Sequence, residues 1–131
     1  MDFIERLNDA INTMVKPPIV CRMGYLGTGE SLVIYPLPGG RVTQEYMDGT
    51  KDQELNYEIA MKSKSHQKIG ETLWTIQSEL EKLDALKSND GSFEFEELII
   101  TNKPFINQLN DQNWFVFLLN IQAKITVYRE E

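Results

Sequence analysis

The residues that could carry out chemistry are few in this chain of 131 residues. It contains one histidine, His66, and one cysteine, Cys21, and neither has a suitable partner nearby in the sequence. A catalytic histidine needs a group that orients it, and a structural zinc ion needs about four histidine or cysteine ligands. The sequence therefore predicts no catalytic residue, no metal, no cofactor and no enzymatic activity.

Three glutamates lie close together, at Glu94, Glu96 and Glu97. General acid–base catalysis would require an apolar pocket that separates their pKa values, and the sequence shows none. Alternation with Phe93 and Phe95 instead predicts the solvent face of an amphipathic strand. Acidic side chains on such a strand also discourage edge-to-edge aggregation.

A glycine-rich string from Gly27 to Ser31 invites interpretation as a phosphate-binding loop. It lacks the Gly-Lys-Ser/Thr ending of a P-loop and does not lie between a clear strand and a helix. We therefore expect an ordinary flexible loop here.

The chain is acidic, with a formal net charge of −7 and an isoelectric point near 4.7. Nucleic-acid binding depends on cations that neutralise phosphates, so we do not expect the outer surface to bind DNA or RNA. One basic cluster, Lys62, Lys64 and Lys68, interrupts this acidity. It has two interpretations, a solvated edge or a docking site for an acidic partner, and the sequence leaves both open.

Length and composition indicate the general class of protein. A chain of this length can bury the core of one domain, which we place at residues 1–131. No apolar run approaches the roughly 20 residues of a membrane span, and the N-terminus has no signal-peptide pattern, so no membrane partner is expected. The single cysteine suits a reducing intracellular setting.

Apolar periodicity predicts two amphipathic helices, over residues 3–15 and about 66–86. Alternating patterns predict three strands between them, forming an antiparallel meander at residues 32–35, 41–47 and about 53–62, with turns at 36–40 and 48–50. A weaker signal at residues 19–21 is compatible with a short strand. Two further strands follow the second helix, at residues 93–102 and 114–128, with a loop at 103–113 between them.

The predicted fold is therefore α+β, with a mostly antiparallel sheet of about five strands and two helices packed on one face. The order of elements is α-β-β-β-α-β-β. One solvent-exposed face and one buried face are typical of an antiparallel sheet that is covered on one side.

The last strand has the clearest pattern in the chain. Every odd position from Phe115 to Val127 is apolar, and at about 3.3 Å per residue the strand could reach on the order of 45 Å. Its even positions begin apolar, with Trp114, Val116 and Leu118. We expect these three side chains to be covered by the preceding loop or by another subunit, and they are candidate interface residues.

Other candidate contacts lie in predicted loops and turns. Phe105, Ile106 and Leu109 are apolar residues in an otherwise polar loop, and Asp48-Gly49 forms a hairpin turn. Exposed apolar loop residues often mark contact surfaces, but they also close the ends of a core. The sequence leaves these two roles open.

Taken along its length, the chain resembles a known family. The segments that carry the resemblance are Tyr46-Met47-Asp48-Gly49, Leu55-Asn56-Tyr57-Glu58-Ile59, Phe93-Glu94-Phe95, Asn102-Lys103-Pro104-Phe105 and Trp114-Phe115-Val116-Phe117. They are similar to the small minor capsid proteins of tailed phages and prophages of Gram-positive bacteria, which are themselves similar to tail terminators.

The resemblance implies a structural virion protein that is made in the bacterial cytoplasm and located at the head–tail junction. Its implied partners are copies of itself in a hexameric ring, the major tail protein and the head connector or neck protein. DNA would pass through the ring without specific binding. The resemblance carries no catalytic residue onto this chain.

Two alternatives stay open from the sequence. The first is a neck or head-completion protein, which belongs to the same setting. The second is a small cytosolic enzyme or ligand-binding domain with a pocket between the second helix and the sheet. That pocket would need convergent polar groups within the apolar face, and the patterns show none.

Overall fold

The computed structural model describes residues 2–88, 91–109 and 114–128, with residues 107–109 described by their backbone alone. The elements confirm the predicted order. They are α1 (Phe3–Met14), β1 (Cys21–Met23), β2 (Ser31–Glu45), β3 (Lys51–Ser63), α2 (His66–Glu81), β4 (Phe93–Leu109) and β5 (Phe115–Val127).

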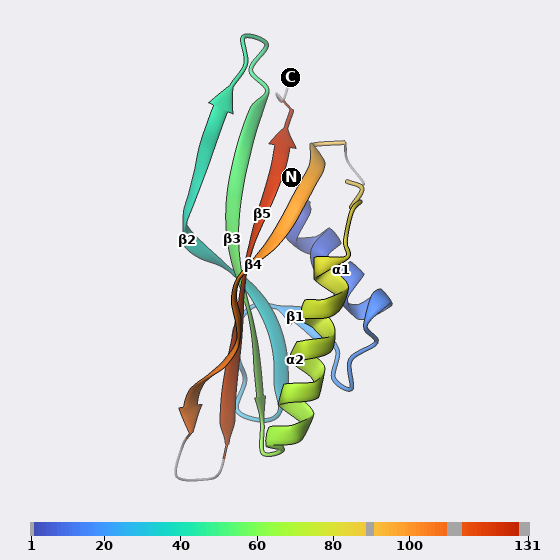
Figure 1. Cartoon of the computed structure of the whole chain (residues 1–131), viewed down its shortest axis with the longest axis vertical. Helices are drawn as coiled ribbons and strands as arrows, with labels where there is room; N and C mark the ends of the chain where they lie inside the picture. Colours follow the sequence, from blue (N-terminus) through green and yellow to red (C-terminus); the bar gives the residue numbers. More distant parts are fainter. Residues whose placement is uncertain (1, 89–90, 110–113, 129–131) are drawn as a thin grey trace.

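The five strands form one twisted sheet in the order β1-β2-β3-β5-β4, and both helices cover the same face (Figure 1). Only β1 and β2 run parallel among the described strands; the other neighbours are antiparallel. The predicted α+β class with a mostly antiparallel sheet is confirmed. We call the helix-covered side the helix face and the other side the open face.

The helix face carries the main core. Odd positions of β5 and β3 point to it, and they meet the buried stripes of both helices. Phe3 of α1 lies against the rings of Tyr57 and Phe93, with centroids 5.6 and 5.2 Å away. The fully buried large side chains in this core include Leu7, Ile11, Leu32, Ile34, Ile59, Met61, Ile69, Leu73, Ile76, Leu80 and Leu119.

The long strand β5 is paired along its whole length within the chain. Each of its residues, from Phe115 to Val127, is in register with a residue of β3, and β4 lies on its other side. The sheet accommodates this length by twisting, so the backbone of β5 needs no neighbouring subunit.

The predicted turn at residues 36–40 is wrong. The chain continues through it as one strand, and a bulge between Leu37 and Arg41 absorbs the extra residues. Pro36 and Pro38 lie beyond the short β1, at an outer edge of β2 where no strand needs their missing N–H groups. Gly39 supplies the positive φ of the bulge, at 97°.

The predicted loop at residues 103–113 is also largely wrong. Strand β4 continues to Leu109, so Phe105 and Ile106 are strand residues. Pro104 is tolerated because β4 is an edge strand, and four irregularities in its register with β5 absorb the extra residues. The remainder of the predicted loop, residues 110–113, lies outside the described residues.

Strand β1 is fastened to α1 by one side chain. The amide of Asn12 donates to the carbonyl of Cys21 at 2.9 Å and accepts from its N–H at 2.8 Å. Cys21 itself is fully buried, and burial raises the pKa of its thiol to about 12.

Replacing Asn12 by alanine should lower the free energy of unfolding by about 1–3 kcal/mol, because two backbone groups of a buried residue lose their partner. Thr13→Ala, at an exposed position of the same helix, is the matched control and should stay within about 0.5 kcal/mol. Urea unfolding of both variants measures the difference. Equal effects would show that the bond to Cys21 contributes nothing.

Candidate interaction surfaces

The hairpin of β2 and β3 ends in an arm, which we define as residues 41–54. Asp48 and Gly49 form its turn: the Asp48 carboxylate accepts from the N–H of Thr50 at 2.9 Å, and Gly49 adopts a φ of 90°. Between Tyr46 and Asp48 stands Met47, whose side chain is fully exposed. The two candidate residues Asp48 and Gly49 therefore shape the turn, while Met47 gives the tip an apolar surface.

The open face beside the arm is polar and acidic. The Tyr46 hydroxyl donates to Asp52 at 2.8 Å, and the Tyr128 hydroxyl donates to Glu94 at 2.6 Å. These bonds raise the pKa of both tyrosines, because an ionised tyrosine would face a carboxylate. The Thr126 hydroxyl lies within hydrogen-bond distance of Asp52 and Glu96, at 2.9 and 2.8 Å, and can donate its one proton to either carboxylate. The carboxylates thus accept bonds from neighbouring hydroxyls on an open surface, which does not suit acid–base catalysis.

Lower on the open face lies a second, smaller apolar cluster. Its buried members are Val33, Ala60, Val116 and Leu118, and Leu26 and Tyr35 pack against them. Val116 and Leu118 are therefore covered within the chain, by Leu26 of the glycine-rich loop before β2 (residues 24–30) and by Tyr35 of β2. Neither the loop before β5 nor a second subunit is needed for this, in contrast to the sequence-based expectation.

Tyr35 fixes the upper border of this cluster. Its hydroxyl donates to Glu58, its cross-strand neighbour on β3. Burial and the carboxylate both raise its pKa. The ring of Tyr25 lies 5.7 Å from that of Tyr35 and is 85% exposed, so the glycine-rich loop presents an aromatic residue to solvent.

Trp114 lies at the lower end of the open face, where two lysines approach its ring. Lys62 Nζ is 5.1 Å and Lys64 Nζ 5.0 Å from the ring centroid, which is within cation–π range. We call Lys62, Lys64 and Trp114 the basic end. The structure thus combines a predicted interface residue with two of the three lysines of the predicted basic cluster.

Phe105 and Ile106 are 38% and 51% exposed and point to opposite faces of the sheet. Phe105 is in register with Leu118 on the open face, and Ile106 with Phe117 on the helix face. The side chain of Leu109 lies outside the described residues, although its backbone pairs with Phe115. These candidates therefore do not form one patch.

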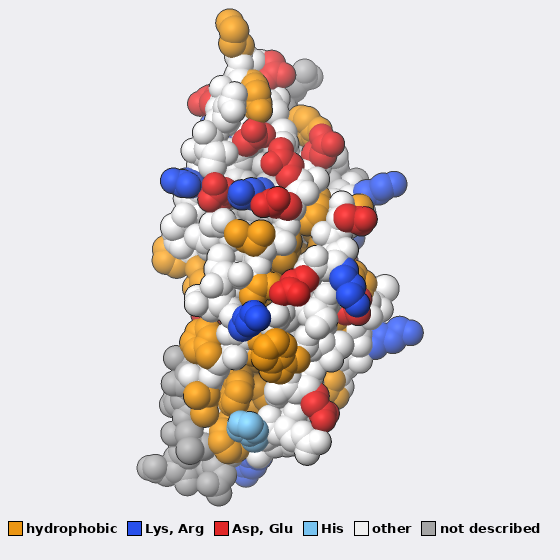
Figure 2. Space-filling view, viewed as in Figure 1, with side chains coloured by type: hydrophobic (Ala, Val, Ile, Leu, Met, Phe, Trp, Pro, Cys, Tyr) orange, Lys and Arg blue, Asp and Glu red, His pale blue; other side chains and the backbone are white. Residues whose placement is uncertain are grey.

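Trp74 of α2 is a large apolar residue at the surface, and it is not among the contacts that the sequence predicts. Its ring is 49% exposed, and Lys103 Nζ from β4 lies 6.0 Å from its centroid. Figure 2 shows apolar side chains gathered over the lower halves of α2 and β4, with the single histidine below them. In the sequence, Trp74 is adjacent to the apolar stripe of its helix. An aromatic residue beside such a stripe is the signal that could have indicated an exposed apolar surface here.

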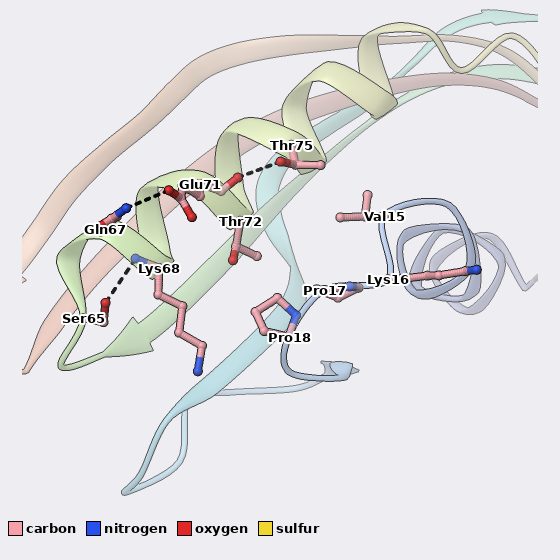
Figure 3. Close-up of a pocket in the computed structure, with 10 residues that line it drawn as sticks. All are labelled: Val15, Lys16, Pro17, Pro18, Ser65, Gln67, Lys68, Glu71, Thr72 and Thr75. Carbon is pink, nitrogen blue, oxygen red and sulfur yellow. Dashed lines mark hydrogen bonds between the residues drawn. The ribbon is translucent and has the colours of Figure 1, made fainter.

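A groove of about 460 Å³ separates the end of α1 from the first turns of α2 (Figure 3). Its walls hold Pro17 and Pro18 on one side and Lys68 and Thr72 on the other. The Thr75 hydroxyl is bonded to the Glu71 carbonyl of its own helix, at 2.8 Å. Ser65, also in the lining, caps α2 by accepting from the N–H of Lys68 at 3.2 Å.

His66, the one histidine of the sequence, lies at the start of α2. Its ring stands edge-on to those of Phe115 and Phe117, with centroids 5.4 and 5.2 Å away. Within the described ranges, no group of three or more histidine, cysteine or acidic side chains could hold a metal ion. No helix in that part of the chain is long and apolar enough to cross a membrane.

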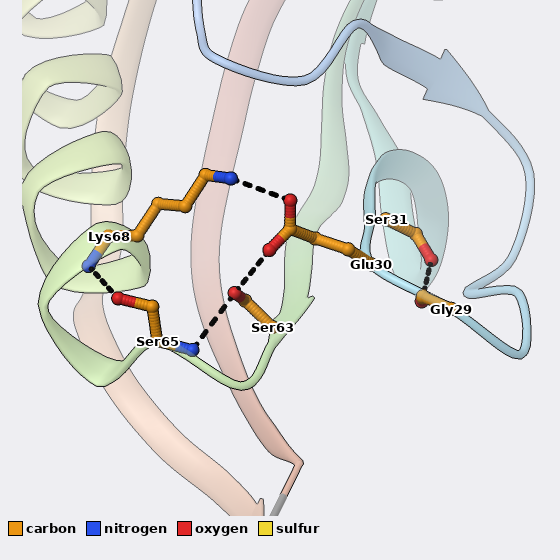
Figure 4. A network of polar contacts seen from close by, with 6 residues as sticks. All are labelled: Gly29, Glu30, Ser31, Ser63, Ser65 and Lys68. Atoms are coloured by element: carbon orange, nitrogen blue, oxygen red, sulfur yellow. Dashed lines mark hydrogen bonds and ion pairs between the residues drawn. The ribbon is translucent and has the colours of Figure 1, made fainter.

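A polar network fastens the glycine-rich loop to the start of α2 (Figure 4). Glu30 accepts from Lys68 Nζ and from the Ser63 hydroxyl, both at 2.6 Å. Ser63 also accepts from the N–H of Ser65, which in turn caps α2 through the N–H of Lys68. Lys68 is therefore a structural member of the basic cluster.

Both partners lower the pKa of Glu30. The hydrogen bonds from Lys68 and Ser63 have the larger effect, and the positive charge of Lys68 has a smaller one. A lowered folded-state pKa means that this contribution to stability is complete above the unfolded-state value of 4.5 and is lost as pH falls through the folded-state value. The side chains of Lys68 and Glu30 are about a third exposed, at 36% and 35%, so solvent screens the pair.

Glu30→Gln should therefore reduce the free energy of unfolding at neutral pH by about 0.5–1 kcal/mol. The gap to wild type should close as the pH falls below 4.5, because the wild-type carboxyl becomes neutral as well. Asp84→Asn, at an exposed position after α2, is the control. A gap that persists in acid would rule out the ionic contribution.

The fold is similar to that of a known virion protein. A solved structure of a chain from the virion of a native gene transfer agent particle superposes with a TM-score of 0.60 at 10% sequence identity. The match covers 94% of this chain and 90% of that one, and at this identity it shows a shared fold. No curated protein sequence matches the chain closely enough to count as a relative.

The family model for bacteriophage tail terminator protein matches residues 7–127, which takes in all the strands and α2. This family is structural and non-enzymatic, and its members are components of the virion. The earlier resemblance to minor capsid proteins agrees with it at that level. The chain belongs to the bacteriophage tail terminator family.

Proposed function

We propose that this protein caps the tail tube of a phage or phage-like particle and joins it to the head connector. The observation that carries the proposal is the family match over residues 7–127. On this proposal the protein works at the head–tail junction. Its partners are the major tail protein on one side and a connector or neck protein on the other.

The two ends of the sheet differ in chemical character. One end carries the acidic arm with the exposed Met47 at its tip. The other carries the basic end, together with the half-exposed Ile106 on the opposite face. Unlike ends can meet head-to-tail between copies, which leaves the remaining surfaces of each copy for the tail and connector proteins.

We further propose that several copies close into a ring, with six as the expected number. A tube needs a cap with a matching axis, and a heterologous contact that repeats with a fixed rotation closes into a ring. The net charge of −7 suits a passage for DNA, because an acidic wall does not hold a polyanion. No specific DNA contact forms part of this proposal.

The direct test mixes the purified protein with major tail protein while tubes polymerise. Tubes should stop growing, and electron microscopy should show the protein at one end of each tube. Light scattering coupled to size exclusion should detect oligomers, in solution or after release from tubes. Tubes of unchanged length with bare ends would contradict the proposal, whereas binding to heads alone would favour a neck or head-completion protein.

Ile106→Asp should weaken tube capping on the order of tenfold or more, because a charge would enter a contact centre that excludes water. Thermal unfolding should stay cooperative, since the wild-type side chain is half exposed. Thr101→Asp, exposed on the same strand, is the matched control. A loss of cooperative melting in Ile106→Asp would instead assign this residue to closing the core.

A further inference from the structure

Charge is segregated along the open face of the sheet. Cross-strand neighbours share a face, so the register gives its composition directly. Near the arm, two rows of cross-strand neighbours on this face hold four carboxylates and two cations. These are Asp52, Glu54, Glu94, Glu97, Arg41 and Lys124. The stretch of β3 and its continuation from Ala60 to Lys64 carries two lysines and no carboxylate.

The arm extends the acidic half beyond the helices. Every residue from Arg41 to Asp48 is exposed, and Glu45 stands within this stretch close to the fully exposed Met47. Between Glu45 and Asp52 the chain holds three carboxylates and one amine. The arm therefore combines a negative charge with an apolar tip, a pairing that suits a basic and aromatic surface.

The basic end has this complementary character. Lys62 is held in place by the carbonyls of Gly27 and Thr28, at 3.3 and 3.4 Å, and by the Trp114 ring. Lys64 is exposed and lies over the same ring. Both ammonium groups are thus positioned before any partner arrives, and a positioned cation loses less conformational entropy on binding.

The arm cannot reach the basic end of its own chain. The two regions lie at opposite ends of β3, whose 13 residues span on the order of 40 Å. Figure 1 shows the hairpin tip and the lower end of β3 pointing in opposite directions. A contact between these surfaces must therefore join two molecules, and because it is head-to-tail it repeats from copy to copy.

We propose that the acidic arm of one copy docks on the basic end of a second copy. Glu45 faces Lys64 in this contact, and Met47 lies against the aromatic surface of Trp114. The inference rests on the proposed self-association, for which it names the surfaces. It also selects one interpretation of the basic cluster, namely a docking site for an acidic partner that is the protein itself.

Exchange of two charges tests the contact. Lys64→Glu and Glu45→Lys should each weaken self-association about fivefold, the size of an exposed ion pair, because like charges meet at every junction. An equimolar mixture should recover the wild-type affinity, since each junction between unlike copies again pairs opposite charges. Sedimentation measures association in solution, and chemical cross-linking measures it among copies bound to tail tubes.

Matched controls reverse charges elsewhere. Lys103→Glu alters the lysine over Trp74, and Glu81→Lys alters an exposed residue of α2; neither should change self-association. Far-ultraviolet circular dichroism and thermal unfolding confirm that all four variants fold.

The outcomes separate this inference from the proposed function. Recovery in the mixture supports the arm contact. Wild-type protein that associates, with variants that neither weaken nor complement one another, overturns the contact and leaves the ring intact. Normal self-association of Lys64→Glu with lost tube capping overturns it in favour of an acidic virion partner at the basic end. Protein that stays monomeric both in solution and on tubes overturns the contact and the proposed ring together.

Discussion

The rest of the structure depends on the double pairing of β5. Its backbone is hydrogen-bonded to β3 on one side and to the edge strand β4 on the other, so it lies inside the sheet although it comes last in the chain. Its odd residues form the floor under both helices, and its even residues begin the small cluster of the open face. The two hairpins, which are far apart in sequence, become one sheet through this strand alone.

That arrangement also explains which parts of the fold the sequence could predict. The apolar stripes of both helices and the alternation in β3 and β5 are strong periodic signals, because one face of each element is buried. The pattern of Pro36 to Gly40 has the composition of a turn, and Pro104 has that of a break. Both expectations failed for the same reason: a strand tolerates prolines where one of its edges is unpaired, and bulges absorb the extra residues.

The interaction surfaces were less predictable than the fold. Val116 and Leu118 look like an exposed patch in the sequence, and their cover comes from Leu26 and Tyr35, which are distant along the chain. A single sequence does not show which loop folds over which strand. Asp48 and Gly49 are candidate contacts in the sequence, yet their residue types serve the geometry of the turn. Met47, between Tyr46 and Asp48, is the exposed apolar side chain.

The basic cluster shows how one sequence pattern divides into separate roles. Lys68 forms an ion pair with Glu30 and so holds the glycine-rich loop to α2. Lys62 serves that loop through two carbonyls and also contacts Trp114. Lys64 is exposed over the same ring, and no backbone or acidic partner of its Nζ atom is seen among the described residues.

A solvated edge would leave all three side chains free to move. Here two of them fix the loop that covers Val116 and Leu118, and the third is left at the surface beside a tryptophan. The same loop that completes the open face therefore also positions the cations that a second acidic surface would meet.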